Sequence, residues 1–159
     1  MTKEELIEIA NKFIKDKTTC MSYNFADIDL NTYDENKLKS AVKEEFQRIL
    51  GICGCGESHL VFEGIYNLLN LMDNKSAWND DLTNKKPEEY EEYVKAYEDL
   101  VGIGEGMTTD WKMLMILYML DDRDFIEHGT SIYWGWPTEL GKDFLKVFDD
   151  KQFDWEEWY

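Results

Sequence analysis

Apolar residues recur every three to four positions along most of the chain, and this spacing predicts a mainly helical fold. The first such run covers residues 3–16, with Leu6 and Phe13 on one face. Thr2 and Glu5 precede it at the spacing of a capping box, in which each side chain accepts a hydrogen bond from the other residue's backbone N–H. An amphipathic helix is therefore expected at the start of the chain.

Three further helices are predicted from start and stop residues. The first runs from Asp34, a suitable N-cap, to Gly51, with Lys and Glu side chains on its outer face. The others begin at Ser58 and at Pro87, which suits a first helical turn. Their apolar faces are expected to consist of Leu38, Ala41, Val42, Phe46, Ile49 and Leu50, of Leu60, Val61, Ile65, Leu68, Leu69 and Met72, and of Tyr90, Tyr93, Val94, Tyr97 and Leu100.

The most apolar segment lies within residues 111–121, where eight consecutive apolar positions leave almost no polar face. A helix that is apolar all round is normally buried. We therefore expect this helix to be the central core element.

The spacing of apolar residues changes after that helix. Phe125–His128 and Ser131–Trp134 are two short β-prone runs separated by Gly129 and Thr130, which predicts a hairpin. A last helix is expected to begin at Thr138, with Leu140, Phe144, Leu145, Val147 and Phe148 as its apolar set. The predicted fold class is mainly α (α+β), with five to six helices and one short β-hairpin near the C-terminus.

The chain of 159 residues has the length of one domain, and 43% of its residues are apolar, which is enough for a core. We treat residues 1–159 as a single domain. Residues 18–34 lack a helical period and are expected to form a packed loop. Residues 73–87 are polar and rich in turn formers, which predicts an exposed loop. Residues 149–159 form an acidic tail that carries aromatic side chains.

Acidic residues dominate the charge: 34 Asp and Glu against 17 Lys and Arg leave a formal charge of −17. Affinity for nucleic acid depends largely on Lys and Arg that neutralise phosphates, and the chain has no basic run. Direct binding to nucleic acid or to anionic membranes is therefore not expected. No segment approaches the ~20 apolar residues of a membrane-spanning helix, and no secretory signal opens the sequence, which predicts a cytoplasmic protein.

Cys53, Cys55 and His59 are the residues that could hold zinc, because thiolates and imidazole are its preferred ligands. Their spacing differs from the paired C-x2-C pattern of structural zinc sites, and a fourth ligand would have to come from Cys20 or His128. Three cysteines also suit reduced thiols better than a disulfide framework. We expect no cofactor, and a small zinc-stabilised protein is kept as an alternative.

Other chemical motifs are incomplete. Gly54 and Gly56 precede a helix, where an anion could bind, but the phosphate-loop signature with its Lys is missing. His128 lies beside Glu127 and near Ser131, yet no order of nucleophile, base and orienting group is present. A histidine that bonds the backbone of its own turn is the simpler interpretation. The chain is therefore not expected to be an enzyme, and no catalytic residue is assigned.

Residues 108–148 follow the order helix, strand, turn, strand, helix, which is similar to part of a winged-helix domain. Such a domain normally reads DNA through a basic helix, whereas the turn here is acidic. Carboxylates beside exposed aromatic residues suit a basic, partly apolar surface on another protein. For the tail, folding back over the chain's own core is an equal alternative. The predicted partner-binding residues are Asp121, Asp122, Asp124 and Glu127 in the turn, and Asp149, Asp150, Asp154, Trp155, Glu156, Glu157 and Trp158 in the tail.

Several short segments also carry a resemblance. They are Cys53-Gly54-Cys55-Gly56, Leu120-Asp121, Phe125-Ile126-Glu127-His128-Gly129-Thr130-Ser131-Ile132, and Trp136-Pro137-Thr138-Glu139-Leu140-Gly141-Lys142. With these, residues 50–72 and 111–147 resemble small phage and prophage proteins without assigned function, in which a leucine commonly stands at the position of Pro137. The resemblance implies a gene of a bacterial virus or integrated element. In size, acidity and lack of a catalytic motif the chain is also similar to anti-CRISPR and other anti-defence proteins.

Charge, motifs and resemblance together predict a non-enzymatic protein-binding inhibitor, encoded by a phage and acting in the host cytoplasm. Its expected partner is a host defence protein with a basic surface, such as a nucleic-acid enzyme, to which an acidic protein is steered electrostatically. A winged-helix-like regulatory or assembly module of a mobile element is the alternative from a different class. The oligomeric state is left open.

Overall fold

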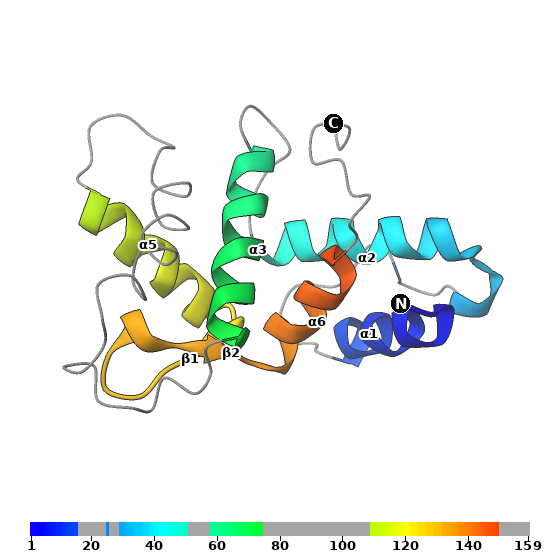
Figure 1. Cartoon of the computed structure of the whole chain (residues 1–159). Coiled ribbons are helices and arrows are strands. Elements are labelled where there is room, and N and C mark those ends of the chain that lie inside the picture. Colours follow the sequence, from blue (N-terminus) through cyan, green and yellow to red (C-terminus); the bar gives the residue numbers. More distant parts are fainter. Residues whose placement is uncertain (16–24, 26–28, 51–57, 75–108, 150–159) are drawn as a thin grey trace.

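A computed structural model of the chain describes residues 1–15, 25, 29–50, 58–74 and 109–149 (Figure 1). These residues form helices and one short antiparallel strand pair near the C-terminus, so the predicted mainly α fold class is confirmed. None of the helices in these ranges has the length and apolarity to cross a bilayer. The elements are α1 (Lys3–Lys15), η1 (Leu30–Thr32), α2 (Glu35–Leu50), α3 (Ser58–Asn74), α5 (Thr109–Asp122), β1 (Ile126–Glu127), η3 (Ile132–Trp134), β2 (Trp136–Pro137) and α6 (Glu139–Phe148).

Side-chain caps start the first two helices where the sequence predicts them. Glu5 Oε2 accepts a hydrogen bond from Thr2 N at 2.7 Å, and Thr2 Oγ1 accepts one from Glu5 N at 3.3 Å. Asp34 Oδ1 accepts from Lys37 N at 2.9 Å. These bonds satisfy backbone N–H groups that have no partner inside the helix, which confirms both predicted starts.

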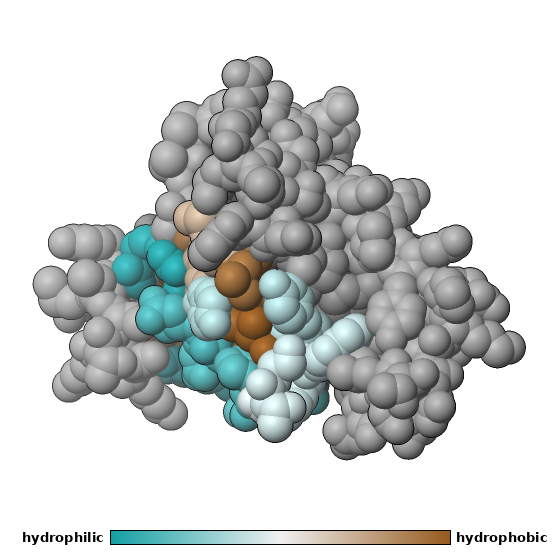
Figure 2. All heavy atoms as spheres, turned by 90° about the vertical axis from the view of Figure 1, so that its left-hand side faces the viewer, coloured by the Kyte–Doolittle hydropathy of each residue, from teal (hydrophilic) through white to brown (hydrophobic). Residues whose placement is uncertain are grey.

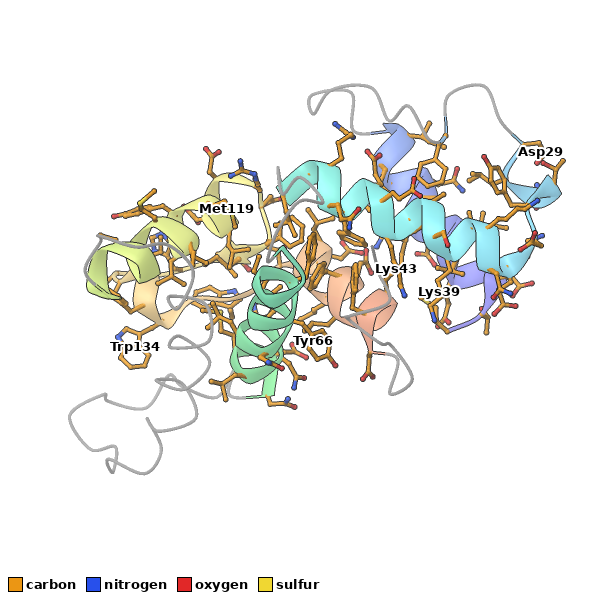
Figure 3. The ribbon with its side chains drawn as sticks, turned by 90° about the horizontal axis from the view of Figure 1, so that it is seen from above. Asp29, Lys39, Lys43, Tyr66, Met119 and Trp134 are labelled. Atoms are coloured by element: carbon orange, nitrogen blue, oxygen red, sulfur yellow. The ribbon has the colours of Figure 1, made fainter. Side chains whose placement is uncertain are left out.

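Five phenylalanine side chains meet at the centre of the core. The ring of Phe46, on α2, packs edge-on against Phe13 of α1 at 5.0 Å and against Phe144 of α6 at 5.4 Å. It also contacts Phe125 at 6.0 Å and Phe148 at 6.1 Å. Figure 3 shows the side chains that fill the space between α2, α3 and α6. The core therefore joins α1 and α6, which lie at opposite ends of the described residues.

The expectation that residues 111–121 form the central core element is wrong. Helix α5 lies at one end of the molecule in Figure 1. Leu117 and Leu120 are buried, but Met115 and Tyr118 are each 55% exposed. The physical reason is that rings from α2 and α6 already fill the centre, so among the described elements α5 packs mainly against η3 and β1.

The predicted second strand, Ser131–Trp134, is also wrong. Residues 132–134 form η3, and β2 pairs with β1 in the register Ile126 with Pro137 and Glu127 with Trp136. Ile132 is buried in the hydrophobic core, a contact with residues distant in sequence that local β-propensity does not reflect. The two strands are therefore joined by a longer connection, and the tight Gly-Thr turn of a wing is not formed.

Two charged residues on α2 do not lie on an exposed face as expected. Lys43 and Glu45 are 7% and 1% exposed. The ammonium of Lys43 lies 5.6 Å from the ring centroid of Phe148, a cation–π contact, and Glu45 accepts a hydrogen bond from Arg48 Nε at 3.1 Å. Long side chains with a partner for their charge can thus occupy positions that the apolar pattern assigns to solvent.

Several predictions lie outside the described residues. Asp73 and Asn74, the first two residues of the predicted exposed loop, belong to α3, so the prediction is wrong for them. Outside the description are the rest of that loop, the helix expected after Pro87, most of residues 18–34, the Cys53–Gly56 loop and the tail beyond Asp149.

The first turn of α6 packs directly on the backbone that precedes β1. A Cβ atom on Gly141 would lie 2.2 Å from the carbonyl oxygen of Phe125, far inside van der Waals contact. Thr138 caps the same turn: its Oγ1 accepts from Gly141 N at 3.2 Å and donates to the carbonyl of Asp124. Only glycine allows this approach, because the opposing atom is backbone and cannot rotate away.

Gly141→Ala should therefore lower the free energy of unfolding by about 2–4 kcal/mol, since the clash forces α6 away from its packing partners. Gly129→Ala is the matched control: a Cβ there meets nothing within 4 Å, and the expected change is within about 0.5 kcal/mol. Urea unfolding followed by circular dichroism measures both. Equal stability of the two variants would contradict the close contact at Gly141.

A nearly buried ion pair connects α1 to α6. Lys12 Nζ lies 2.6 Å from Asp143 Oδ2 and 2.9 Å from Glu139 Oε1. The Asp143 side chain is only 4% exposed, and its charge is compensated by Lys12 through a hydrogen bond and by Lys146, whose Nζ lies 3.7 Å from Asp143 Oδ1. Burial lowers the pKa of Lys12, but the hydrogen bonds to Asp143 and Glu139 outweigh burial and raise it overall.

Lys12→Met should lower the free energy of unfolding by about 2 kcal/mol, because the buried Asp143 carboxylate loses its hydrogen-bonded cation and keeps only Lys146 at 3.7 Å. Lys37→Met is the matched control, since Lys37 lies 3.7 Å from Asp34 and both side chains are well exposed. Exposed pairs contribute roughly 0–1 kcal/mol, so the control should change little. Urea denaturation measures the free energy of unfolding of both variants. If Lys37→Met were as destabilising as Lys12→Met, the stabilising role of the Lys12 ion pair would be contradicted.

The effect of Lys12→Met should depend on pH. The raised pKa of Lys12 adds stability below its ordinary value of 10.5, and this stability is lost as pH rises through the folded value. The hydrogen bond from Lys12 lowers the pKa of Glu139, which adds stability above the ordinary 4.5 that is lost as pH falls. The stability difference between wild type and variant should be largest between about pH 5 and 10. A difference that stays constant from pH 3 to 11 would contradict this.

Candidate protein-binding surface

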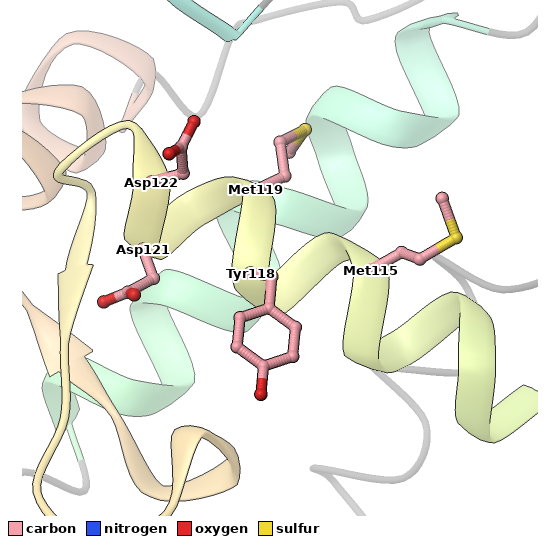
Figure 4. Close-up of a pocket in the computed structure, with 5 residues that line it drawn as sticks. All are labelled: Met115, Tyr118, Met119, Asp121 and Asp122. Atoms are coloured by element: carbon pink, nitrogen blue, oxygen red, sulfur yellow. The ribbon is translucent and has the colours of Figure 1, made fainter.

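One side of α5 forms a shallow hollow that combines apolar side chains with carboxylates. Its lining residues are Met115, Tyr118, Met119, Asp121 and Asp122 (Figure 4), and we call this set the α5 surface. Spacings of three and four residues place Met115, Tyr118, Met119 and Asp122 on one face of the helix. In the view of Figure 4, Tyr118 and Asp121 lie along one flank of this broad face, and Met119 and Asp122 lie along its other flank.

The apolar part of the α5 surface is open to solvent. Met115 and Tyr118 are each 55% exposed, and Met119 is half-buried. Figure 2, which faces this end of the molecule, shows a narrow strip of hydrophobic residues with hydrophilic residues on either side of it. Large exposed apolar side chains grouped within a polar rim are typical of protein–protein contact sites.

The charge of the α5 surface is concentrated at its C-terminal end. Asp121 and Asp122 close the helix, where the negative end of the helix dipole adds to their potential. Within the described ranges no Lys or Arg forms an ion pair with either carboxylate. His128 Nε2 lies 3.7 Å from Asp121 Oδ2 and carries charge only when protonated.

Arg123, the cation nearest in sequence, is bound elsewhere. Its Nε donates to the carbonyl of Ile49 at 2.9 Å and its Nη1 to that of Met119 at 3.4 Å. The guanidinium therefore satisfies carbonyls at the ends of α2 and α5. The two aspartates keep their charge available to a partner.

Asp124 and Glu127 differ from Asp121 and Asp122 because each has a role in stabilising the fold: Asp124 in ending α5, and Glu127 in a side-chain hydrogen bond. Asp124 has φ 62°, and its N–H bonds Asp121 O at 3.0 Å while Phe125 N bonds Leu120 O at 2.8 Å. This is the hydrogen-bond pattern of a Schellman motif that ends α5. Glu127 Oε1 accepts a hydrogen bond from Trp136 Nε1 at 2.6 Å across the strand pair.

Asp149 lies on a different part of the molecule. Its Oδ1 accepts a hydrogen bond from the Tyr66 hydroxyl at 3.1 Å, in a hollow between α3 and α6 that also contains Lys142 and Lys146. Burial and the Asp149 carboxylate raise the pKa of Tyr66 to about 12, so this hydroxyl stays a donor at neutral pH. The structure thus does not bring Asp149 together with the α5 surface. The other predicted tail residues, Asp150, Asp154, Trp155, Glu156, Glu157 and Trp158, lie outside the described residues.

The candidate metal ligands are not described: Cys53 and Cys55 lie outside the described ranges, and His59 is described only as part of the α3 backbone. Among the described side chains no three of His, Cys, Asp or Glu gather as a metal site. His128 Nδ1 lies 3.0 Å from the carbonyl of Gly129, the turn contact that the sequence suggested.

Sequence reasoning missed Met115, Tyr118 and Met119, because it assigned the whole apolar segment to the core. The available signal was their spacing, which continues without a break to Asp122. Comparison with protein-family models, with curated proteins and with solved structures finds no match for this chain. Its function must therefore be argued from this surface.

Asp124→Gly should raise the free energy of unfolding by about 0.5–1 kcal/mol, because glycine adopts the left-handed conformation without the penalty of a Cβ. Asp122→Gly, at the last helical position, gains no such relief, because Asp122 already has a right-handed helical backbone, and the free energy of unfolding should not rise. Thermal unfolding of both variants measures this difference. A loss of stability in Asp124→Gly would contradict the capping role of this residue.

Proposed function

We propose that this chain is a non-enzymatic inhibitor that binds a basic surface of another protein, of the kind that nucleic-acid enzymes use for their substrate. In the phage setting that the resemblance implies, the target is a host defence protein. The single observation that carries the proposal is the α5 surface, where exposed apolar side chains adjoin Asp121 and Asp122 and no described Lys or Arg pairs with them.

Each part of this surface supplies a different contribution to binding. Apolar burial of Met115 and Tyr118 would supply affinity, because such burial is favourable by roughly 25 cal/mol per Å². The carboxylates would supply orientation and speed, since opposite charges steer association. A formal charge of −17 adds a long-range attraction to any cationic groove and repels competing nucleic acid.

Inhibition then requires no chemistry by the chain. A carboxylate surface that occupies a cationic groove excludes phosphates from it, because both would pair with the same Lys and Arg side chains. Binding should weaken as salt is raised, with screening over about 10 Å at 0.1 M ionic strength.

The test compares two double charge reversals of equal net charge. Asp121→Lys/Asp122→Lys alters the α5 surface, and Glu4→Lys/Glu8→Lys alters exposed positions of α1 at the other end of the molecule (Figure 1). Wild type and both variants are immobilised and exposed to nuclease-treated bacterial lysate at low salt, and captured proteins are identified by mass spectrometry. We expect wild type and the α1 variant to capture a nucleic-acid-binding protein that added DNA or RNA displaces, and the α5 variant to lose it.

The captured protein is then assayed with its own nucleic-acid substrate. Inhibition by wild type, reduced at least about tenfold by the α5 reversal, supports the proposal. Equal inhibition by all three proteins, or capture of no basic nucleic-acid-binding protein, would reject it.

A further inference from the structure

We infer that the α5 surface takes one class of partner segment, an amphipathic helix whose apolar face lies on Met115, Tyr118 and Met119 and whose Lys or Arg meets Asp121 and Asp122. The inference rests on the proposed function and specifies the part of the partner that makes contact. It follows from the shape, the backbone and the charge of the surface.

The shape favours a helix of about two turns. Met115 and Asp122 are seven residues apart, which at 1.5 Å per residue is roughly 10 Å along α5. The apolar side chains occupy positions i, i+3 and i+4, so they form a ridge with the hollow beside it. Helices pack by placing the ridges of one into the grooves of the other. A partner helix with apolar residues at the same spacing can therefore pack against the ridge and into the hollow beside it.

The backbone argues against an added strand. A strand binds mainly through main-chain hydrogen bonds to an open sheet edge. The α5 surface is a helix face, where the backbone groups are bonded within the helix and only side chains are presented. The described strands, β1 and β2, have two residues each and pair with one another.

The charge decides between a second copy of this chain and a different protein. Two copies meeting through this face would place four aspartates in one small interface and bring together two chains of formal charge −17, and repulsion between like charges is costly. A partner with Lys or Arg beside its apolar residues removes that cost. Tyr118 adds a preference for Arg, whose planar guanidinium can stack on the ring while its N–H groups reach a carboxylate.

The methionines widen the range of helices that fit. Met115 and Met119 have unbranched, rotatable side chains that adapt to different apolar neighbours. We therefore expect recognition of a pattern, apolar residues at helical spacing followed by a basic residue within about one turn, and no single sequence.

Selection from a displayed library of random 16-residue peptides tests the inference. The wild-type chain is the bait. Counter-selection against the variant Tyr118→Ala/Met119→Ala removes peptides that bind outside the α5 surface. Enriched peptides should share the pattern above and gain helical circular dichroism on binding. Fluorescence anisotropy should show that Tyr118→Ala weakens them about tenfold or more, as expected for a central aromatic contact.

Ile14→Ala is the matched control, because Ile14 is an exposed apolar residue of α1, 40% exposed, outside the α5 surface. It should leave the peptide affinity within twofold of wild type. Unchanged circular dichroism and melting temperature establish that each variant is folded.

The possible failures are distinguishable. The selected peptides could instead be basic, lack an apolar helical pattern and bind Tyr118→Ala as tightly as wild type. This result would overturn the helix inference, and the proposed function would stand. Peptides whose binding resists Asp121→Lys/Asp122→Lys would count against both. A dimer of the chain in light scattering that Tyr118→Ala dissociates would show that a second copy occupies the surface, and the inference would be wrong.

Discussion

The packing of Phe46 is the interaction on which the rest of the structure depends. Its ring contacts Phe13, near the start of the described chain, and Phe125, Phe144 and Phe148, near its end. Edge-on ring contacts give each pair a preferred geometry in addition to the area that they bury. Because this cluster fills the centre, α5 must pack at the periphery, and its outer side chains remain exposed.

Local signals predict the fold wherever they act within a few residues. The Thr2–Glu5 and Asp34–Lys37 hydrogen bonds form as the sequence indicates, and the helix starts follow from them. The burial of Ile132 and of Lys43 depends instead on residues far away in sequence. Periodicity cannot report which of several apolar segments reaches the centre, and this is why α5 and the second strand were misplaced.

The same limit applies to the candidate surface. Its carboxylates could be predicted, because Asp121 and Asp122 follow an apolar run within an acidic turn. The sequence could not predict that Asp124 and Glu127 have structural roles instead. The role of Asp124 depends on its φ angle, and that of Glu127 depends on its hydrogen bond with Trp136. The exposure of Met115 and Tyr118 could not be predicted, because all residues from 113 to 120 are apolar. Which side of an entirely apolar helix is buried and which is exposed is determined only by its packing in the folded protein.

The ion pairs of Lys12 have a consequence for how the protein is made. They join residues 127 and 131 positions apart, so α1 leaves the ribosome long before α6 exists. At roughly 5 to 20 residues per second, synthesis of the intervening chain takes on the order of ten seconds. During that interval the apolar face of α1 lacks its C-terminal partner and the chain is open to chaperones and proteases. The contacts between α1 and α6 can therefore form only once α6 has been made.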